Sequence, residues 1–188
     1  MTYYRGIALV GKARSGKDTV AKRLIQRFAY TRVAFADPLR MMALDVDPIV
    51  CAQSHYRLKA IVEDIGWDRA KEDYPEIRRI LQNIGQTVRD LDPKFWLRQG
   101  LDKIEVADRW NLPVVVTDVR YRNEVRALVN RDFLTVRILR DGAGLSGDSG
   151  KHDSETELDG FECDRVISND GTVAELNTIV DTLVMPRA

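Results

Sequence analysis

The sequence contains little of what secreted, membrane-spanning or metal-cluster proteins are built from. Its two cysteines, Cys51 and Cys163, are isolated and lack metal-ligand spacing, which argues against a disulfide framework or a zinc site. The amino terminus has no apolar segment of the secretory type, and no apolar run approaches the length that crosses a membrane. The sequence therefore predicts a soluble protein of the reducing cytoplasm, with no membrane partner.

An excess of charge of one sign is also missing. Lysine and arginine together number 29, as do aspartate and glutamate, so the formal net charge is zero. Proteins that bind nucleic-acid polymers usually carry a basic excess, so no such polymer is expected as a partner. A local basic pocket for a small polyanion is still compatible with this balance. The length of 188 residues predicts a single domain with a sizeable core.

The most informative segment is residues 11–18, which read Gly-Lys-Ala-Arg-Ser-Gly-Lys-Asp and directly follow an apolar run. They match the phosphate-binding P-loop pattern G-x-x-x-x-G-K-[ST], except that Asp18 replaces the hydroxyl residue and Thr19 follows it. In such a loop backbone N–H groups point at phosphate oxygens, and the lysine, Lys17, supplies a positive charge. The helical pattern that follows would present its positive dipole end to the same anion. The motif predicts binding of a nucleoside triphosphate.

Short apolar runs alternate with longer helical patterns along the rest of the chain. The runs at 6–10, 32–35, 113–117, 134–139 and 165–167 are almost continuously apolar, as buried parallel strands are. Helical patterns between strands predict βαβ units. The expected fold class is therefore α/β, a P-loop NTPase fold with a five-stranded parallel sheet flanked by helices.

Two segments depart from this alternation. Residues 37–110 are almost entirely helical in pattern, which in a P-loop protein predicts an inserted region that binds the phosphate acceptor. Residues 141–157 are rich in glycine and charge, and we name them the lid segment because a short mobile lid is expected there. A disordered surface loop is the alternative for the lid segment, since polar glycine-rich loops are common.

The helix expected at 76–90 carries a polar stripe beside its apolar face. Arg78, Gln82, Gly85 and Arg89 lie on one side of this helix because their successive spacings are four, three and four residues. Arginine suits a phosphate through its planar fork of donors, and an amide can pair with a base edge. The stripe predicts recognition of a phosphorylated ligand, and a solvated helix face is the alternative.

Two carboxylates follow predicted strands. Asp118 ends the apolar run at 113–117, where a P-loop enzyme places the carboxylate that holds Mg²⁺ directly or through water, and Arg120 lies two residues on. Asp37 follows the second strand, and Arg40 comes one helical turn later, so either side chain could face the acceptor. As alternatives, Asp118 simply terminates a strand, and Asp37 caps a helix that begins with Pro38.

Several further cations stand near the predicted phosphate site. Arg14 lies in the loop itself, and Arg137 and Arg140 end the fourth strand before the lid segment. Phosphoryl transfer relies on positioning and on cations that stabilise spreading negative charge, so such a convergence fits a transferase. Neither His55 nor His152 has the context of a base or a ligand. The residues expected to act in catalysis are Lys17, Arg14, Asp118, Arg120 and Arg140.

Five segments resemble the bacteriophage deoxynucleoside monophosphate kinases, whose fold is that of P-loop nucleoside monophosphate kinases. They are Gly-Lys-Ala-Arg-Ser-Gly-Lys-Asp-Thr, Phe-Ala-Asp-Pro-Leu-Arg, Arg-Arg-Ile-Leu-Gln-Asn-Ile-Gly, Thr-Asp-Val-Arg-Tyr-Arg-Asn-Glu and His-Asp-Ser-Glu-Thr-Glu-Leu. The resemblance extends over roughly residues 6–180, and Asp18 in the P-loop is normal for this group.

The resemblance implies the reaction ATP + dNMP → ADP + dNDP with Mg²⁺ as cofactor, in the cytoplasm of a host cell if the gene is a phage gene. It implies an ATP site made of Gly11, Ala13, Arg14, Ser15, Gly16, Lys17, Asp18 and Thr19. The implied dNMP site consists of Asp37, Arg40, Arg78, Gln82, Arg89 and Arg120. Metal ligation, directly or through water, would fall to Asp18, Thr19 and Asp118.

Other assignments stay open on the sequence. Dephospho-coenzyme A kinase and phosphomevalonate kinase resemble this group in fold, so the acceptor is less certain than phosphoryl transfer. A P-loop ATPase or a non-enzymatic nucleotide-binding module is the alternative of a different class. A kinase would consume ATP only when an acceptor is added. The sequence leaves the oligomeric state open, a homodimer included.

Overall fold

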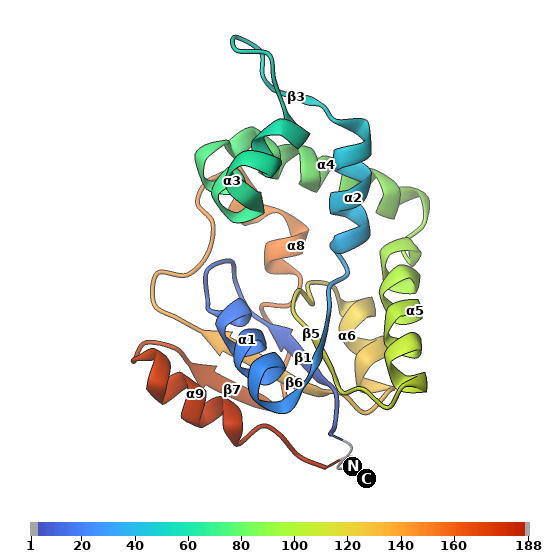
Figure 1. The fold of residues 1–188 in the computed structure, drawn as a ribbon, viewed down its shortest axis with the longest axis vertical. Helices are drawn as coiled ribbons and strands as arrows, with labels where there is room; N and C mark the ends of the chain where they lie inside the picture. Colours follow the sequence, from blue (N-terminus) through green and yellow to red (C-terminus); the bar gives the residue numbers. More distant parts are fainter. Residues whose placement is uncertain (1–3, 187–188) are drawn as a thin grey trace. The chain divides into compact units, whose positions relative to one another are not determined.

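The computed structural model of the chain describes residues 4–186. It divides into two compact units (Figure 1). The sheet unit comprises Met1–Phe35 and Leu97–Ala188, and the helical unit comprises Ala36–Trp96. No helix in the described part of the chain is long and apolar enough to span a membrane.

The sheet unit is built on five parallel strands in the order β2-β5-β1-β6-β7. The strands are β1 Ile7–Val10, β2 Thr31–Val33, β5 Val114–Val116, β6 Leu134–Leu139 and β7 Arg165–Ser168. All five strands expected from the sequence are present, each within one or two residues of its expected bounds, so the predicted fold class is confirmed. The strand that precedes the P-loop is central, which places the loop at the carboxyl ends of the strands, where α/β proteins bind ligands.

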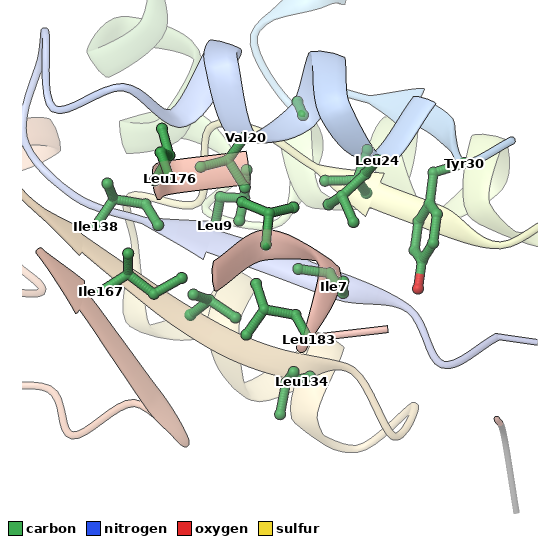
Figure 2. Close-up of a cluster of buried hydrophobic side chains, with 14 residues drawn as sticks. Ile7, Leu9, Val20, Leu24, Tyr30, Leu134, Ile138, Ile167, Leu176 and Leu183 are labelled. Carbon is green, nitrogen blue, oxygen red and sulfur yellow. The ribbon is translucent and has the colours of Figure 1, made fainter. Parts of the chain in front are cut away.

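Side chains on both faces of the sheet are buried, which explains why the strands are apolar throughout. Ile7 and Leu9 of β1 point into one core cluster, together with residues of α1 Lys17–Phe28 and α9 Val173–Asp181 (Figure 2). The next residues along β1, Ala8 and Val10, point into a second cluster on the opposite face.

Two further helices cover that opposite face. They are α5 Phe95–Arg109, which contributes Leu97 and Ile104, and α6 Arg122–Val129, which contributes Val125 and Leu128. The sheet is therefore flanked by helices on both sides, as the continuous apolar strands predicted.

The carboxyl-terminal helix α9 begins as its sequence predicts. The Thr172 hydroxyl accepts a hydrogen bond from the Glu175 N–H, and the Glu175 carboxylate accepts one from the Thr172 N–H, which together form a capping box. Its buried residues Leu176 and Val180 then pack into the first core cluster.

The helical unit has a core of its own. Its helices are α2 Asp37–Val46, α3 Leu58–Asp73 and α4 Pro75–Leu91. Ala43, Leu58, Ile61, Ala70 and Ile77 are its buried centre. Helix α3 is broken at Gly66, whose positive φ of 75° suits glycine.

The helical unit differs from the expected all-helical segment at 37–110 in two respects. It contains a short antiparallel pair, β3 Ile49–Cys51 and β4 Tyr56–Arg57, where the sequence predicted no strand. It also ends at Trp96, because α5 from Leu97 onward packs on the sheet instead.

The lid segment contains two helices of four residues each, α7 Asp148–Lys151 and α8 Asp153–Thr156. His152 starts the second of them, because its ring nitrogen Nδ1 accepts a hydrogen bond from the Ser154 N–H at 3.1 Å. His152 therefore serves as a helix cap. The mobility of the lid segment stays a prediction.

Candidate active site

The P-loop has the backbone conformation that its glycines predict. Gly11 has φ 151° and Gly16 has φ 103°, values that side chains disfavour. A Cβ added to Gly11 would lie 2.6 Å from the carbonyl oxygen of Ile138, so the neighbouring strand also leaves room for glycine alone. Helix α1 starts at Lys17 with Gly16 as its cap and no side-chain cap. The N–H groups of its first turn and its dipole form an anion site.

Lys17 lies inside this loop. Its ammonium donates hydrogen bonds of 2.7 Å to the carbonyl oxygens of Gly11 and Lys12. Burial, reinforced by the nearby Arg120 guanidinium, lowers the pKa of Lys17 to about 8, although Glu155 and Asp118 act in the opposite direction. The loop thus holds a partly desolvated cation whose charge a polyphosphate would stabilise.

Asp118 lies at the carboxyl end of the sheet, as expected. Its carboxylate oxygen Oδ1 accepts a 2.8 Å hydrogen bond from the Phe35 N–H, which ties the segment after β5 to the segment after β2. Its charge acts on both Lys17 and Arg120. The structure therefore brings Asp118, Arg120 and the P-loop lysine into one electrostatic neighbourhood within the sheet unit.

Arg120 is held by acidic groups on both its backbone and its side chain. Its N–H donates to the carboxylate of the buried Glu124 at 2.9 Å. Its guanidinium pairs closely with the Glu155 carboxylate and donates to the Ser154 carbonyl at 2.9 Å. Burial has the largest single effect and would lower the pKa of Arg120. The charge and hydrogen bond of Glu155, together with the charges of Asp118 and Glu124, outweigh burial, so the pKa is raised. Arg120 is therefore a fixed cation beside Lys17.

The lid segment contacts the P-loop at one residue from two sides. The Ala13 N–H donates to the Glu155 carboxylate oxygen Oε2 at 3.3 Å, and the Gly144 N–H donates to the Ala13 carbonyl at 2.9 Å. Lys12 reinforces the contact, since its ammonium lies 2.5 Å from both the Glu155 carbonyl and the Asp159 carboxylate. The two segments that sequence reasoning paired as loop and lid thus meet directly.

Asn169, directly after β7, contacts the P-loop where helix α1 begins. Its side-chain amide donates to the Ser15 carbonyl at 2.9 Å, and its own N–H donates to the Leu139 carbonyl at 2.8 Å. A Cβ on Gly16 would come within 2.1 Å of the Asn169 amide nitrogen. Asn169 therefore fixes the turn at which the P-loop becomes α1.

The remaining predicted cations of the sheet unit have different surroundings. Arg14 is exposed in the loop with a left-handed φ of 65°. Arg137 donates hydrogen bonds of 2.7 Å to the carbonyls of Leu158 and Phe161. It therefore links β6 to the segment that follows the lid segment. Arg140 is exposed, and its charge acts on Asp170.

The predicted metal ligands supply oxygen donors of the kind that Mg²⁺ prefers. Asp18 and Asp118 both act electrostatically on Lys17, and Thr19 follows in the first turn of α1. Mg²⁺ in nucleotide sites usually takes one or two carboxylates and completes its shell with water and phosphate. Within residues 4–186 no three acidic, His or Cys side chains are grouped so that they could hold a metal ion.

The helical unit contains a cluster of cations around the α3–α4 junction. The Arg78 guanidinium donates to the Lys71 carbonyl at 2.9 Å, and the Arg40 guanidinium stacks on the Trp67 ring at 5.9 Å from its centroid. Burial lowers the pKa of Lys71, and the charges of Arg40 and Arg78 lower it further, although its ion pair with Asp68 at 3.0 Å acts in the opposite direction. Arg40 and Arg78 therefore both lie within electrostatic range of the Lys71 ammonium.

The other predicted acceptor residues of the helical unit are Asp37 on α2 and Gln82 and Arg89 on α4. Arg89 reaches the Pro93 carbonyl at 3.5 Å, and its eleven-residue separation from Arg78 corresponds to about 16 Å along the helix. The recognition of one phosphorylated ligand by this stripe stays a prediction. Gln82 lies between them on α4 and is half-buried. Asp37 is the first residue of α2 and pairs with Arg40 at 3.4 Å, while Ala36 takes the cap position.

Three functional candidates escaped the sequence prediction: Trp67, Lys71 and Glu155. Trp67 and Lys71 lie in a helix that gave no amphipathic signal because Gly66 breaks it. Glu155 lies within the His-Asp-Ser-Glu segment, whose role only the tertiary contact with Arg120 reveals. For Lys71, the sequence signal that could have been used is its position: it lies in the last turn of α3, and Arg78 lies near the start of the next helix, α4.

Comparison with known proteins adds a family. A family model described as deoxynucleotide monophosphate kinase matches residues 52–180. A putative deoxynucleotide monophosphate kinase of Acanthamoeba polyphaga mimivirus is 26% identical over 185 residues, which cover 90% of each chain. Two uncharacterised proteins of Ictalurid herpesvirus 1, ORF76 and ORF77, are 32% and 35% identical over 179 and 134 residues.

The relatives and solved structures limit what can be transferred. The alignment covers 93% of this chain and 64% of ORF76, and 67% of this chain and 58% of ORF77. The relatives are proteins of a herpesvirus and a mimivirus, so a bacteriophage origin stays a prediction.

Two solved structures have a similar fold. Dephospho-CoA kinase from Campylobacter jejuni superimposes with a TM-score of 0.52 at 11% identity, over 95% of each chain. TT1252 from Thermus thermophilus gives a TM-score of 0.50 at 16% identity, over 95% of this chain and 96% of that one. These likenesses support the fold alone. The family model matches residues 52–180, which is more than half of the chain, and the P-loop lysine and the acidic strand end are in place. The chain therefore belongs to the deoxynucleotide monophosphate kinase family.

Proposed function

We propose that the protein transfers the γ-phosphoryl group of ATP to a deoxynucleoside 5'-monophosphate, which yields ADP and a deoxynucleoside diphosphate. The observation that carries the proposal is the Lys17 ammonium, held inside the P-loop beside Asp118 and Arg120. Membership of the deoxynucleotide monophosphate kinase family supports the acceptor class. This reaction supplies precursors of dNTPs for DNA synthesis.

The sheet unit provides the donor site of this proposal. The N–H groups of residues 11–19 cradle the β- and γ-phosphates, and Lys17 leaves the carbonyls of Gly11 and Lys12 to bind phosphate oxygens. Arg120 offers a second fixed positive charge where negative charge spreads during transfer. Arg14 and Arg140, both exposed, would approach the phosphates when the lid segment moves.

The helical unit provides the acceptor site. We infer that Arg40, Lys71 and Arg78 bind the acceptor monophosphate, since their mutual repulsion in a partly desolvated place is relieved by an anion. Gln82 and Arg89 lie farther along α4, where they are candidates for contact with the sugar and base. Asp37 orients Arg40 through their ion pair.

Magnesium fits the donor site as a cofactor because Asp18, Thr19 and Asp118 supply oxygen ligands, directly or through water. The ion would neutralise phosphate charge and align the donor when bound. The contribution of the protein is to place two carboxylates near the ammonium of Lys17.

We further expect the enzyme to work in the cytoplasm on small nucleotides, with no nucleic acid polymer as partner. The formal net charge of zero supports that expectation. A homodimer remains one of the oligomeric states compatible with the chain.

An acceptor panel tests the proposed function. ATP, Mg²⁺ and the protein are combined with each deoxy- and ribonucleoside monophosphate, with dephospho-coenzyme A and with phosphomevalonate, and ADP release is followed. We expect ADP release that depends on a deoxynucleoside monophosphate. Release with dephospho-coenzyme A or phosphomevalonate alone would contradict the acceptor class, and steady release without any acceptor would indicate an ATPase.

A further inference from the structure

The Glu155 carboxylate contacts groups that the proposed function assigns to the ATP phosphates. One of its oxygens accepts the Ala13 N–H at 3.3 Å, and the other pairs with the Arg120 guanidinium. Its charge also acts on Lys17. The Glu155 carboxylate thus contacts the Ala13 N–H and the Arg120 guanidinium, and its charge acts on the Lys17 ammonium. The proposed function assigns all three groups to the ATP phosphates.

The contact between Glu155 and Arg120 lies in the interior of the protein. The Glu155 side chain is only 4% exposed, although charged carboxylates are seldom buried without a strong partner. Neighbouring backbone contacts fix its position, because the Lys12 ammonium and the Arg120 guanidinium bind the carbonyls of Glu155 and Ser154. Gly144 of the same lid segment holds the other side of Ala13.

We propose that Glu155 acts as a built-in competitor of nucleotide phosphate, which closes the lid segment over the nucleotide-free P-loop and which ATP must displace. Two anions cannot both occupy the Ala13 N–H and the Arg120 guanidinium, because like charges at such distances repel. Arrival of ATP phosphates therefore expels Glu155, frees Arg120 to bind phosphate, and releases the lid segment. Glu155 is a positioning residue for Arg120 and not a group that touches the reacting atoms.

This inference rests on the proposed function, since it takes ATP as the ligand of the loop. It makes a specific statement about energy: the nucleotide-free protein is stabilised by a contact that the ATP-bound protein lacks. Removing the Glu155 charge therefore destabilises the free protein and tightens ATP binding by the same amount.

Direct titration tests the inference without any turnover. The dissociation constants of ATP and of tripolyphosphate are measured for the wild type, for Glu155→Gln and for Glu162→Gln. Glu162 is exposed on the chain that follows the lid segment, so its substitution removes the same charge away from the loop. We expect Glu155→Gln to bind both ligands about tenfold more tightly, the size expected when the competing state loses one charge-assisted hydrogen bond. Glu162→Gln is expected to match the wild type.

Thermal unfolding gives the second measurement. The melting temperature of Glu155→Gln should lie below that of the wild type without nucleotide, and the difference should shrink at saturating ATP. A purely structural role for Glu155 would keep that difference constant and leave both dissociation constants unchanged, which would overturn the proposal. If Glu155→Gln does not fold, Glu155→Asp is used, whose shorter side chain cannot reach both partners; it too should bind tripolyphosphate more tightly. A wild type that binds no ATP would overturn this proposal and the proposed function together, whereas equal ATP binding by all variants would overturn only this one.

Discussion

The pKa of Lys17 leads to a prediction about stability that needs no ligand. Burial lowers this pKa from 10.5 to about 8 in the folded protein. Between those two values the unfolded chain binds more protons than the folded one, so the lysine contributes a stability that rises with pH. Below pH 8 the ammonium is charged in both states, and the folded protein carries the full cost of its desolvation.

The perturbation is Lys17→Met, which keeps an unbranched side chain one atom shorter and removes the charge. One pKa unit corresponds to about 1.36 kcal/mol. The free energy of unfolding of the wild type minus that of the variant should therefore rise by about 2.5 kcal/mol between pH 7 and pH 10. Other lysines and tyrosines titrate in the same range, but they are common to both proteins and cancel in the difference. The same variant should lose orders of magnitude in turnover, as Lys17→Ala should.

Urea unfolding of both proteins without nucleotide, at pH 7, 8, 9 and 10, measures this difference. A difference that stays constant with pH would mean that Lys17 keeps an ordinary pKa and is not desolvated in the loop. In that case the P-loop geometry from which the donor site is built would be refuted. Near-normal turnover of Lys17→Met would refute the donor assignment independently.

Three further predictions follow from the same structure. Arg78→Ala should raise the acceptor KM about 10- to 100-fold with little change in the ATP KM, because it removes one charged donor to phosphate. Arg79→Ala, at the exposed neighbouring residue, is the control. Equal effects of Arg78→Ala on both KM values would remove Arg78 from the acceptor site. Gly11→Ala should lower the free energy of unfolding by about 1–3 kcal/mol in urea titrations, because the new Cβ meets the Ile138 carbonyl at a positive φ, whereas Gly160→Ala, which meets nothing, should change it by less than about 0.5 kcal/mol. EDTA should stop phosphoryl transfer, and excess Mg²⁺ should restore it, because the proposed donor site holds Mg²⁺ together with the ATP phosphates.

The sheet unit was largely predictable because its signals are local. Each strand is a short apolar run, and the loop after β1 carries its own glycine pattern, so Ile7–Val10 and the P-loop could be placed from adjacent residues alone. The capping box at Thr172 is similarly contained within four residues. Patterns of this kind do not depend on the rest of the fold.

The features that were missed depend on tertiary contacts. Strands β3 and β4 span three and two residues, too few for an alternating pattern to appear. Helix α5 reads as helical in the sequence, but its periodicity does not say that Leu97 and Ile104 pack on the sheet. The role of Glu155 depends on Arg120, which lies 35 residues away along the chain.

In the acceptor region the sequence predicted the helix but not the contacts of its side chains. Helix α4 was expected at 76–90 and is present as Pro75–Leu91. The structure adds the neighbours of its arginines, the Lys71 carbonyl for Arg78 and the Pro93 carbonyl for Arg89, while the binding of one ligand by the stripe stays a prediction. Helical spacing reports which residues share a side, and it does not report which of them meet one ligand.

The central claim is transfer of a phosphoryl group from ATP to a deoxynucleoside monophosphate, and transfer of label tests it most directly. The protein is incubated with Mg²⁺, ATP labelled with ³²P at the γ-phosphate and one deoxynucleoside monophosphate at a time, and the products are separated by charge. We predict that the label appears in the β-position of a deoxynucleoside diphosphate for at least one base, and that Lys17→Met forms none. Label found only in inorganic phosphate, with every acceptor left unlabelled, would contradict the account.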